Sequence, residues 1–368
     1  MPRLDSRAAK KPTKPSTTTR RSQSSVRNIG PKRKSFLPSL GKVNPLNVSQ
    51  QQELFFQNSC LTNPILSYSY PNQKSEYLSK FQPSSTYLQQ AIHILESCLA
   101  EFGSESNYFR SDGGELLDQG QTINAIQTYV SELGLTGIVD IVFSEQAIAP
   151  AACSYNSKTK KGQVTISLPI IYRKNRIGGA MDHEIGTHLI RTLNETKQVW
   201  YKKRDKFNLK PFLETEEGLA TLHTVIRLAM NRNKKPYLWR SALHYYTSYQ
   251  SSQMNFVDLF SHMERYIDDP GQRFKEVLRV KRGLEDTSQI GGCYKDQVYL
   301  SGAIKILQKR QEINFDDFYM GKLSLDDYFR DDIRDKITKE KTVLPTFLKD
   351  KEEYMRALDY IAQINGLD

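Results

Sequence analysis

The sequence has few cysteines, few histidines and no long apolar stretch, and these shortages exclude several classes of protein. Its four cysteines, Cys60, Cys98, Cys153 and Cys293, are far apart and form no C-x-x-C pair. They predict neither a disulfide framework nor a structural zinc cluster. No stretch approaches the roughly 20 apolar residues of a membrane span, and the N-terminal region lacks the apolar run of a secretory signal. We therefore expect a cytoplasmic protein without a membrane partner.

Acidic residues are almost absent from the first 45 positions. Residues 1–45 contain 12 Lys or Arg and one acid, Asp5, so they account for the whole net charge of +11, and the rest of the chain is neutral. This segment is rich in Ser, Thr and Pro and has few large apolar residues, so burial cannot offset its ordering entropy. We predict a disordered basic tail over residues 1–45 and a single folded domain over residues 46–368.

Two of the six histidines bracket a glutamate in one short segment. His183, Glu184 and His188 form the pattern H-E-x-x-x-H, one residue longer than the H-E-x-x-H helix of many zinc proteases. On a regular α-helix, five residues rotate the second imidazole roughly 140° from the first, which is too far to share a metal. A π-type turn would reduce this angle to about 50°, and Gly186 lies inside the interval, where a backbone distortion costs least. A metal site here therefore requires a π-type turn.

A second motif supports the metal hypothesis. Residues 215–220 read T-E-E-G-L-A and open another stretch of helical apolar periodicity. Glu217 to Ala220 match the E-x-x-A signature of zincins that take a third ligand, a glutamate, from a following helix. Two imidazoles, one carboxylate and a water form an open zinc site of the catalytic kind. Glu184 is outside this ligand set and is free to act on the water, and Glu216 is the alternative ligand if the register differs by one.

Short apolar runs just before the H-E-x-x-x-H segment predict a small sheet. Residues 137–143, 153–155 and 163–168 have the composition of strands, with a polar turn over residues 156–162. Zincins pair the main chain of the substrate with an edge strand of such a sheet. The sequence does not indicate which strand lies at the edge, and an ordinary hairpin is the alternative.

Helical periodicity dominates the remainder of the chain. We predict helices after Pro83 and over residues 122–133, 236–249, 255–267, 272–280, 297–311 and 354–364, with another around Leu325. Residues 46–77 and 103–120 are predicted to be irregular. The predicted fold class is α+β: a zincin-like metallopeptidase with a small mixed sheet, an active-site helix and a helical C-terminal half.

Several blocks of the sequence resemble the microtubule-associated tyrosine carboxypeptidases, zinc enzymes that remove the C-terminal tyrosine of α-tubulin. The resemblance covers residues 183–188, 215–220, 237–240, 243–247, 281–283 and 295–300, in the same order. It implies a zinc metallocarboxypeptidase with His183, His188 and Glu217 as Zn²⁺ ligands and Glu184 as general base. The alternatives are a zincin peptidase with another protein substrate and a non-catalytic protein that binds microtubules or another polyanion.

An exopeptidase must also bind a free carboxylate, which calls for a fixed cation near the metal. Lys281, Arg282 and Lys295 lie in the blocks shared with the family, and we expect them to bind substrate together with Tyr299. Tyr299 and His223 are also candidate donors to the oxyanion of the reaction. An ordinary surface charge, or a packing role for His223, is the alternative in each case.

The basic tail suits an acidic partner. The microtubule surface, nucleic acid and anionic lipid all fit, and charge alone does not separate them from each other or from a solvated tail without a partner. The resemblance favours microtubules and the α-tubulin tail as partners, and hence a cytoskeletal location. We expect neither a nucleic-acid nor a membrane partner.

Overall fold

The computed structural model describes residues 44–69, 78–145 and 150–368. All of them belong to one unit of the chain, Pro38–Asp368. The predicted tail over residues 1–45 lies almost wholly outside the described residues, so the boundary between 45 and 46 remains a prediction. Among the described helices, none combines the length and the apolar character needed to cross a bilayer.

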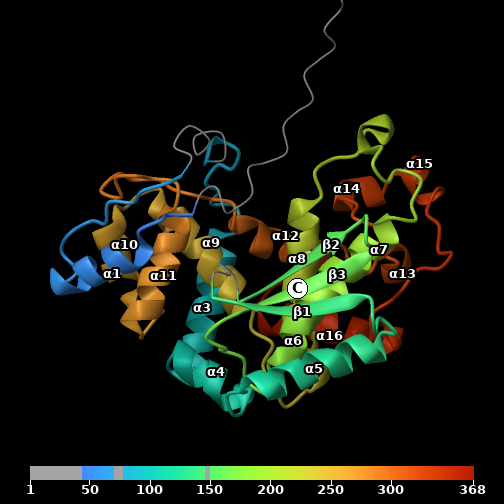
Figure 1. Cartoon of the computed structure of the whole chain (residues 1–368), viewed down its shortest axis with the longest axis horizontal. Helices are drawn as coiled ribbons and strands as arrows, with labels where there is room; N and C mark the ends of the chain where they lie inside the picture. Colours follow the sequence, from blue (N-terminus) through green and yellow to red (C-terminus); the bar gives the residue numbers. More distant parts are fainter. Residues whose placement is uncertain (1–43, 70–77, 146–149) are drawn as a thin grey trace, which may run out of the picture. The chain divides into compact units, whose positions relative to one another are not determined.

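The described residues are mostly helical (Figure 1). The helices before the sheet are α1 (Val48–Gln57), α3 (Leu88–Phe102), α4 (Glu105–Gly113) and α5 (Gln119–Glu132). Those after it are α6 (Ile177–Met181), η3 (Asp182–Leu189), α7 (Ile190–Glu195), η4 (Arg204–Phe207), α8 (Leu213–Met230), α9 (Trp239–Ser251), α10 (Phe256–His262), η5 (Met263–Arg265), α11 (Pro270–Lys281), α12 (Gln297–Lys309), α13 (Phe315–Phe318), α14 (Leu325–Tyr328), α15 (Asp331–Arg334), η6 (Thr346–Leu348) and α16 (Lys351–Ile364).

Two of these helices lie in segments predicted to be irregular. Helix α4 begins at Ser104, whose hydroxyl accepts a hydrogen bond from the N–H of Asn107. Serine is typical of both helix caps and loops, so the Ser- and Gly-rich composition was a misleading signal. Helix α1 has no side-chain cap at Asn47, and the packing of the buried Phe55 against the core holds it in place. Both predictions of irregular structure were wrong for these helices.

The three predicted strands are confirmed as β1 (Val139–Ser144), β2 (Ala151–Asn156) and β3 (Lys161–Ser167). Strand β3 lies between the other two, parallel to β1 and antiparallel to β2 (Figure 1). The small sheet is therefore mixed, as predicted. Strands β1 and β2 are its edges, and β2 packs against η3.

A π-helix interrupts the helix that carries the two histidines. Helices α6, η3 and α7 follow one another without a break, and η3 is a π-helix over all its eight residues. The predicted π-type turn is confirmed and is longer than a single turn. Gly186 has an ordinary negative φ. A Cβ there would lie 2.4 Å from Oη of Tyr129 and 3.1 Å from a ring carbon of Phe347, so glycine serves close packing at this position.

Helices α8 and α12 touch through two glycines. A Cβ on Gly218 would lie 2.2 Å from the carbonyl carbon of Gly302, and a Cβ on Gly302 would lie 1.9 Å from the main-chain oxygen of Glu214. The two backbones are thus in direct contact, with no space for a methyl group. This contact fixes the start of α8 against the middle of α12.

We expect Gly302→Ala to destabilise the protein although alanine is the better helix former. The added methyl would force α8 and α12 apart and lower the free energy of unfolding by about 1–3 kcal/mol. Gly120→Ala on α5 is the matched control, because its Cβ would meet nothing closer than Oδ1 of Asp118 at 3.4 Å. It should leave stability unchanged or raise it by roughly 0.5–1 kcal/mol. Equal unfolding midpoints in urea for Gly302→Ala and wild type would contradict the tight contact.

Candidate metal centre

Three side chains from two helices converge at one point. His183 and His188 come from η3 and Glu217 from the start of α8, and one ligand atom of each lies within 4.8 Å of the others. The imidazole centroids are 4.9 Å apart, with the ring planes at 80°. The π-helix thus brings residues five positions apart onto one face, as the spacing required.

The environment of His183 leaves its Nε2 free for a metal. Its Nδ1 lies 2.9 Å from Oγ1 of Thr224, and that hydroxyl donates to the main-chain oxygen of Ala220 at 3.0 Å. Because the hydroxyl uses its proton there, it accepts the N–H of Nδ1. Nε2 is then the unprotonated nitrogen, which is the form that binds metal.

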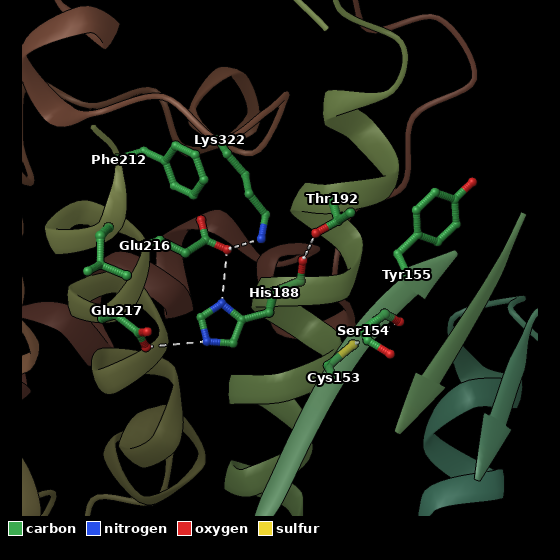
Figure 2. A pocket seen from close by; sticks show the side chains of 10 residues that line it. Cys153, Ser154, Tyr155, His188, Thr192, Phe212, Glu216, Glu217 and Lys322 are labelled. Carbon is green, nitrogen blue, oxygen red and sulfur yellow. Dashed lines mark hydrogen bonds and ion pairs between the residues drawn. The ribbon is translucent and has the colours of Figure 1, made fainter. Parts of the chain in front are cut away.

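His188 is oriented by the glutamate that was the alternative ligand. Its Nδ1–H donates to Oε1 of Glu216 at 2.9 Å, while its Nε2 lies 3.5 Å from Oε2 of Glu217. Glu216 also accepts from Nε of Arg191 at 2.8 Å and pairs with Nζ of Lys322 at 3.0 Å. Figure 2 shows His188 between the two glutamates. The geometry therefore places Glu217 in the metal group and Glu216 behind His188, where a carboxylate typically orients a ligating histidine.

Neighbouring charges tune the ionisation of this group. Burial alone would lower the pKa of His188, but its hydrogen bonds with Glu216 and Glu217 raise it to about 10. Burial and the neighbouring His188 lower the pKa of His183 to about 4. Burial would raise the pKa of Glu217, yet its contact with His188 lowers it to about 2. Burial would also raise the pKa of Glu216, but the charges of Lys322 and Arg191 lower it, so both glutamates are anionic at neutral pH.

Glu184 lies beside the metal group without joining it. Its Oε1 is 4.0 Å from Nε2 of His183, and its carboxylate accepts a hydrogen bond from the main-chain N–H of Cys153 on β2. Burial raises the pKa of Glu184 to about 7. A carboxyl group with a pKa close to neutrality can both take up and release a proton, which is what a general base and acid requires.

The edge strand β2 opens onto a cavity of about 260 Å³ that also includes His188, Glu217 and Lys322 (Figure 2). The N–H of Ser167 donates to the main-chain oxygen of Pro150 at 3.0 Å. Because the pairing alternates along antiparallel strands, the main-chain groups of Cys153 and Tyr155 face away from β3. The structure thus identifies β2 as the edge strand beside the site, which the sequence left open.

Two of the four predicted substrate-binding residues lie beside the metal group. Nζ of Lys295 is 3.8 Å from Oε1 of Glu217 and 5.8 Å from the ring centroid of Tyr299. The ammonium of Lys295 makes no hydrogen bond within the described part of the chain. Burial, together with the charges of Glu217 and Asp296, raises the pKa of Tyr299 well above its ordinary value, so the phenol keeps its proton.

Lys281 and Arg282 have other partners. The fully buried ammonium of Lys281 donates to four main-chain oxygens at 2.5–3.2 Å, those of Ser251, Met254, Gln289 and Gly291. Arg282 donates to Oδ2 of Asp296 at 3.3 Å. These contacts give both side chains a structural role, although Nε of Arg282 is buried without a hydrogen-bond partner among the described residues.

His223 is not placed to stabilise an oxyanion. Its side chain is fully buried, and its two nitrogens lie 2.7 Å from Oγ1 of Thr187 and 2.8 Å from Oη of Tyr354. Since both nitrogens already make hydrogen bonds within the protein, the predicted role of His223 as a donor to the oxyanion is wrong. His223 belongs to the packing behind the π-helix.

Sequence reasoning missed three residues around the metal group. Arg191 follows His188 by three positions and Thr224 follows Glu217 by seven, so helical periodicity was an available signal for both. Lys322 lies in a loop after α13, far away in the sequence, and no local pattern indicates its contact with Glu216.

The structure thus defines a mostly helical protein with a small mixed sheet and a two-histidine, one-glutamate group that fits a metal ion. The profile of the family described as microtubule-associated tyrosine carboxypeptidase matches residues 79–366. The chain belongs to this family.

Curated relatives agree with the family match. Microtubule-associated tyrosine carboxypeptidase 1 of Mus musculus is 35% identical over 331 residues, which cover 89% of this chain and 68% of the relative. The Rattus norvegicus protein of the same name is 36% identical over 332 residues, with the same coverage of both chains. Putative tyrosine carboxypeptidase MATCAP2 of Homo sapiens is 42% identical over 198 residues, 53% of this chain and 37% of the relative.

Separate substitution of Glu216 and Glu217 should show which of the two binds the metal and which only orients His188. We expect Glu217→Gln to weaken divalent-metal binding by more than about 100-fold, and Glu216→Gln to weaken it by roughly 10–100-fold through the loss of His188 orientation. Glu214→Gln is the control, since Glu214 is on the same helix but pairs with Lys305. Competition titration with a chromogenic chelator measures all three. A larger loss for Glu216→Gln than for Glu217→Gln would reverse the assignment.

Proposed function

We propose that this chain is a zinc metallocarboxypeptidase of the zincin kind that removes the C-terminal tyrosine of α-tubulin, and that it acts in the cytoplasm on microtubules. Its membership of the tyrosine carboxypeptidase family supports the reaction and the partner. The observation that carries the proposal is the π-helix, because it brings His183 and His188 together with Glu217.

Zn²⁺ fits this donor set. Zinc accepts imidazole nitrogen and carboxylate oxygen, and three protein ligands leave one position open for water or substrate. Nδ1 of His183 is hydrogen-bonded to Thr224 and Nδ1 of His188 to Glu216, so the two Nε2 atoms would be the ligands of the metal. When bound, zinc would act as a Lewis acid on the scissile carbonyl and would lower the pKa of a water to about 7.

The protein side chains supply the proton transfers. Glu184 lies next to His183, and with a pKa of about 7 it can take a proton from the attacking water and pass it to the leaving amine. Tyr299 keeps its phenolic proton and can donate a hydrogen bond to the developing oxyanion. Glu216 holds His188 in its ligating orientation throughout.

Lys295 is the best-placed cation for the substrate carboxylate. It is the ammonium beside Glu217 that has no hydrogen bond within the described residues, so it can donate to a substrate. We assign no substrate contact to Lys281, whose ammonium donates to main-chain oxygens of the fold, or to Arg282, which pairs with Asp296. The N–H and carbonyl of Tyr155 and the carbonyl of Cys153, which face away from β3, would pair with the substrate backbone as an added strand.

A basic rim favours an acidic substrate. A second hollow of about 730 Å³ adjoins the first through Ser154 and Tyr155 and is lined by Lys158 and Lys161 of the β2–β3 hairpin. Lys161 is partly neutralised by Asp140 at 3.1 Å. Positive charge along this path would attract a glutamate-rich C-terminal tail, and the basic residues before position 46 would add to the attraction.

The proposal is tested on tyrosinated microtubules. Loss of one C-terminal tyrosine from α-tubulin, followed by mass spectrometry, should occur with wild type. With Glu184→Gln, kcat should fall by roughly 10²–10⁴-fold because the proton acceptor is lost. Glu184→Gln should still bind one zinc, which separates loss of chemistry from loss of metal.

The remaining outcomes distinguish the alternatives. Bound zinc without cleavage of tubulin would indicate another protein substrate. Cosedimentation with microtubules but neither zinc nor cleavage would indicate a non-catalytic binding protein and would overturn the proposal.

Lys295→Met should mainly affect recognition of the free carboxylate. A hydrogen bond to a charged group contributes about 1.5–3 kcal/mol, so we expect KM for an α-tubulin tail peptide to rise roughly 10–100-fold. Lys305→Met is the control, because Lys305 lies on α12, the helix that follows Lys295, and pairs with Glu214 outside the site. Steady-state kinetics give KM and kcat for both variants. An unchanged KM for Lys295→Met would assign the carboxylate to another cation.

A further inference from the structure

A buried chain of hydrogen bonds joins the π-helix η3 to the C-terminal helix α16. Oη of Tyr354 lies 2.8 Å from Nε2 of His223, and Nδ1 of His223 lies 2.7 Å from Oγ1 of Thr187. Thr187 in turn donates to the main-chain oxygen of Asp182 at 2.8 Å. All four residues are at most 1% exposed. None of them belongs to the proposed ligand set.

The direction of these hydrogen bonds follows from the last link. The hydroxyl of Thr187 donates to a carbonyl, so its oxygen must accept the N–H of Nδ1 of His223. Nε2 of His223 is then an acceptor, and the phenol of Tyr354 donates to it. Every donor in the chain has an acceptor, and each link polarises the next in this dry interior. Removal of the Tyr354 hydroxyl would leave Nε2 of His223 buried without its partner, whereas Nδ1 also lies 3.2 Å from Oη of Tyr319.

The bond made by Thr187 matches the π register. Its hydroxyl reaches the carbonyl five residues earlier, that of Asp182. Thr192 and Thr247 lie in α-helices, and their hydroxyls reach the carbonyls four residues earlier, at 2.6 and 2.8 Å. A threonine whose hydroxyl donates to the carbonyl five residues earlier therefore favours the π-helical backbone over the α-helical one.

Helix α8 also holds the side chain of Asp182, the first residue of η3. Nε of Arg227 donates to Asp182 at 2.6 Å, and Oη of Tyr129 donates at 2.8 Å. His223 and Arg227 are on the same helix as Glu217. The helix that carries the third ligand therefore contacts η3 through two side chains, Arg227 with the carboxylate of Asp182 and His223 with the hydroxyl of Thr187.

We propose that Thr187, His223 and Tyr354 are positioning residues that hold η3 in its π register and so bring His183 and His188 onto one metal ion. This inference rests on the zinc centre of the proposed function. If η3 relaxed toward an α-helix, the second imidazole would turn away from the first and the metal would lose a ligand.

Thr187→Val tests the inference, because it keeps the shape of the side chain and removes the hydroxyl. We expect the zinc dissociation constant, measured by competition with a chromogenic chelator, to rise roughly 10–100-fold, as for other supports of metal ligands. Thr187→Ser restores the hydroxyl and should bind zinc within about threefold of wild type. Thr247→Val is the matched control: it is equally buried but bonds the fourth carbonyl in α9. It should lower the melting temperature of the zinc-free protein without changing zinc affinity.

Tyr354→Phe tests the last hydrogen bond of this network, because it removes only the hydroxyl that donates to His223. We expect a rise of roughly 2–10-fold in the zinc dissociation constant, since one neutral hydrogen bond is lost. Combined with Thr187→Val it should add less than the product of the single effects, because both act on one network. Tyr328→Phe, whose hydroxyl bonds Asn314 instead, is the control and should leave zinc affinity unchanged.

Two results would overturn the inference while leaving the proposed function intact. One is wild-type zinc affinity in Thr187→Val, and the other is an equal loss of affinity in Thr247→Val. A wild-type protein that binds no zinc would instead overturn the proposed metal centre, and this inference with it.

Discussion

The five-residue spacing between His183 and His188 is the constraint on which the rest of this structure depends. A regular α-helix cannot bring the two imidazoles together, so the helix has to widen into a π-helix. Such helices are rare because their geometry is less favourable, and contacts from several other elements hold this one in place. Gly186 admits Tyr129 and Phe347 to close contact, and α8 binds the first residue of η3.

Helix α8 organises the site through its periodicity. Glu217 is at its beginning, His223 and Thr224 follow about two turns later, and Arg227 follows one turn after those. Each of these side chains contacts η3 or its histidines. One helix thus supplies one member of the metal group, a hydrogen-bond partner for a second member and two contacts to the π-helix. The geometry of the metal group is therefore set mainly by the packing of two helices.

The sequence predicted the parts of this arrangement that depend on local pattern. Spacing along the chain predicts the three strands and the helices in segments with strong apolar periodicity. It also predicts the need for a π-type turn. Residues contributed by distant segments were not predictable in this way. Lys322 reaches Glu216 from a separate loop, and the four oxygens that bind Lys281 come from two different segments. For Lys281, positive charge suggested a surface or substrate role, and for Lys322 no local pattern suggested any role; tertiary contacts determine the surroundings of both.

The direct contact of Gly218 with Gly302 also links the metal group to Lys295, the proposed anchor of the substrate carboxylate. Glu217 adjoins the first glycine, and Lys295 and Tyr299 precede the second on the turns that lead to it. With the two backbones locked together, the distance from the metal group to the Lys295 ammonium cannot vary much. If that ammonium holds the terminal carboxylate as proposed, this fixed separation would set how far from the end of the substrate the scissile bond lies.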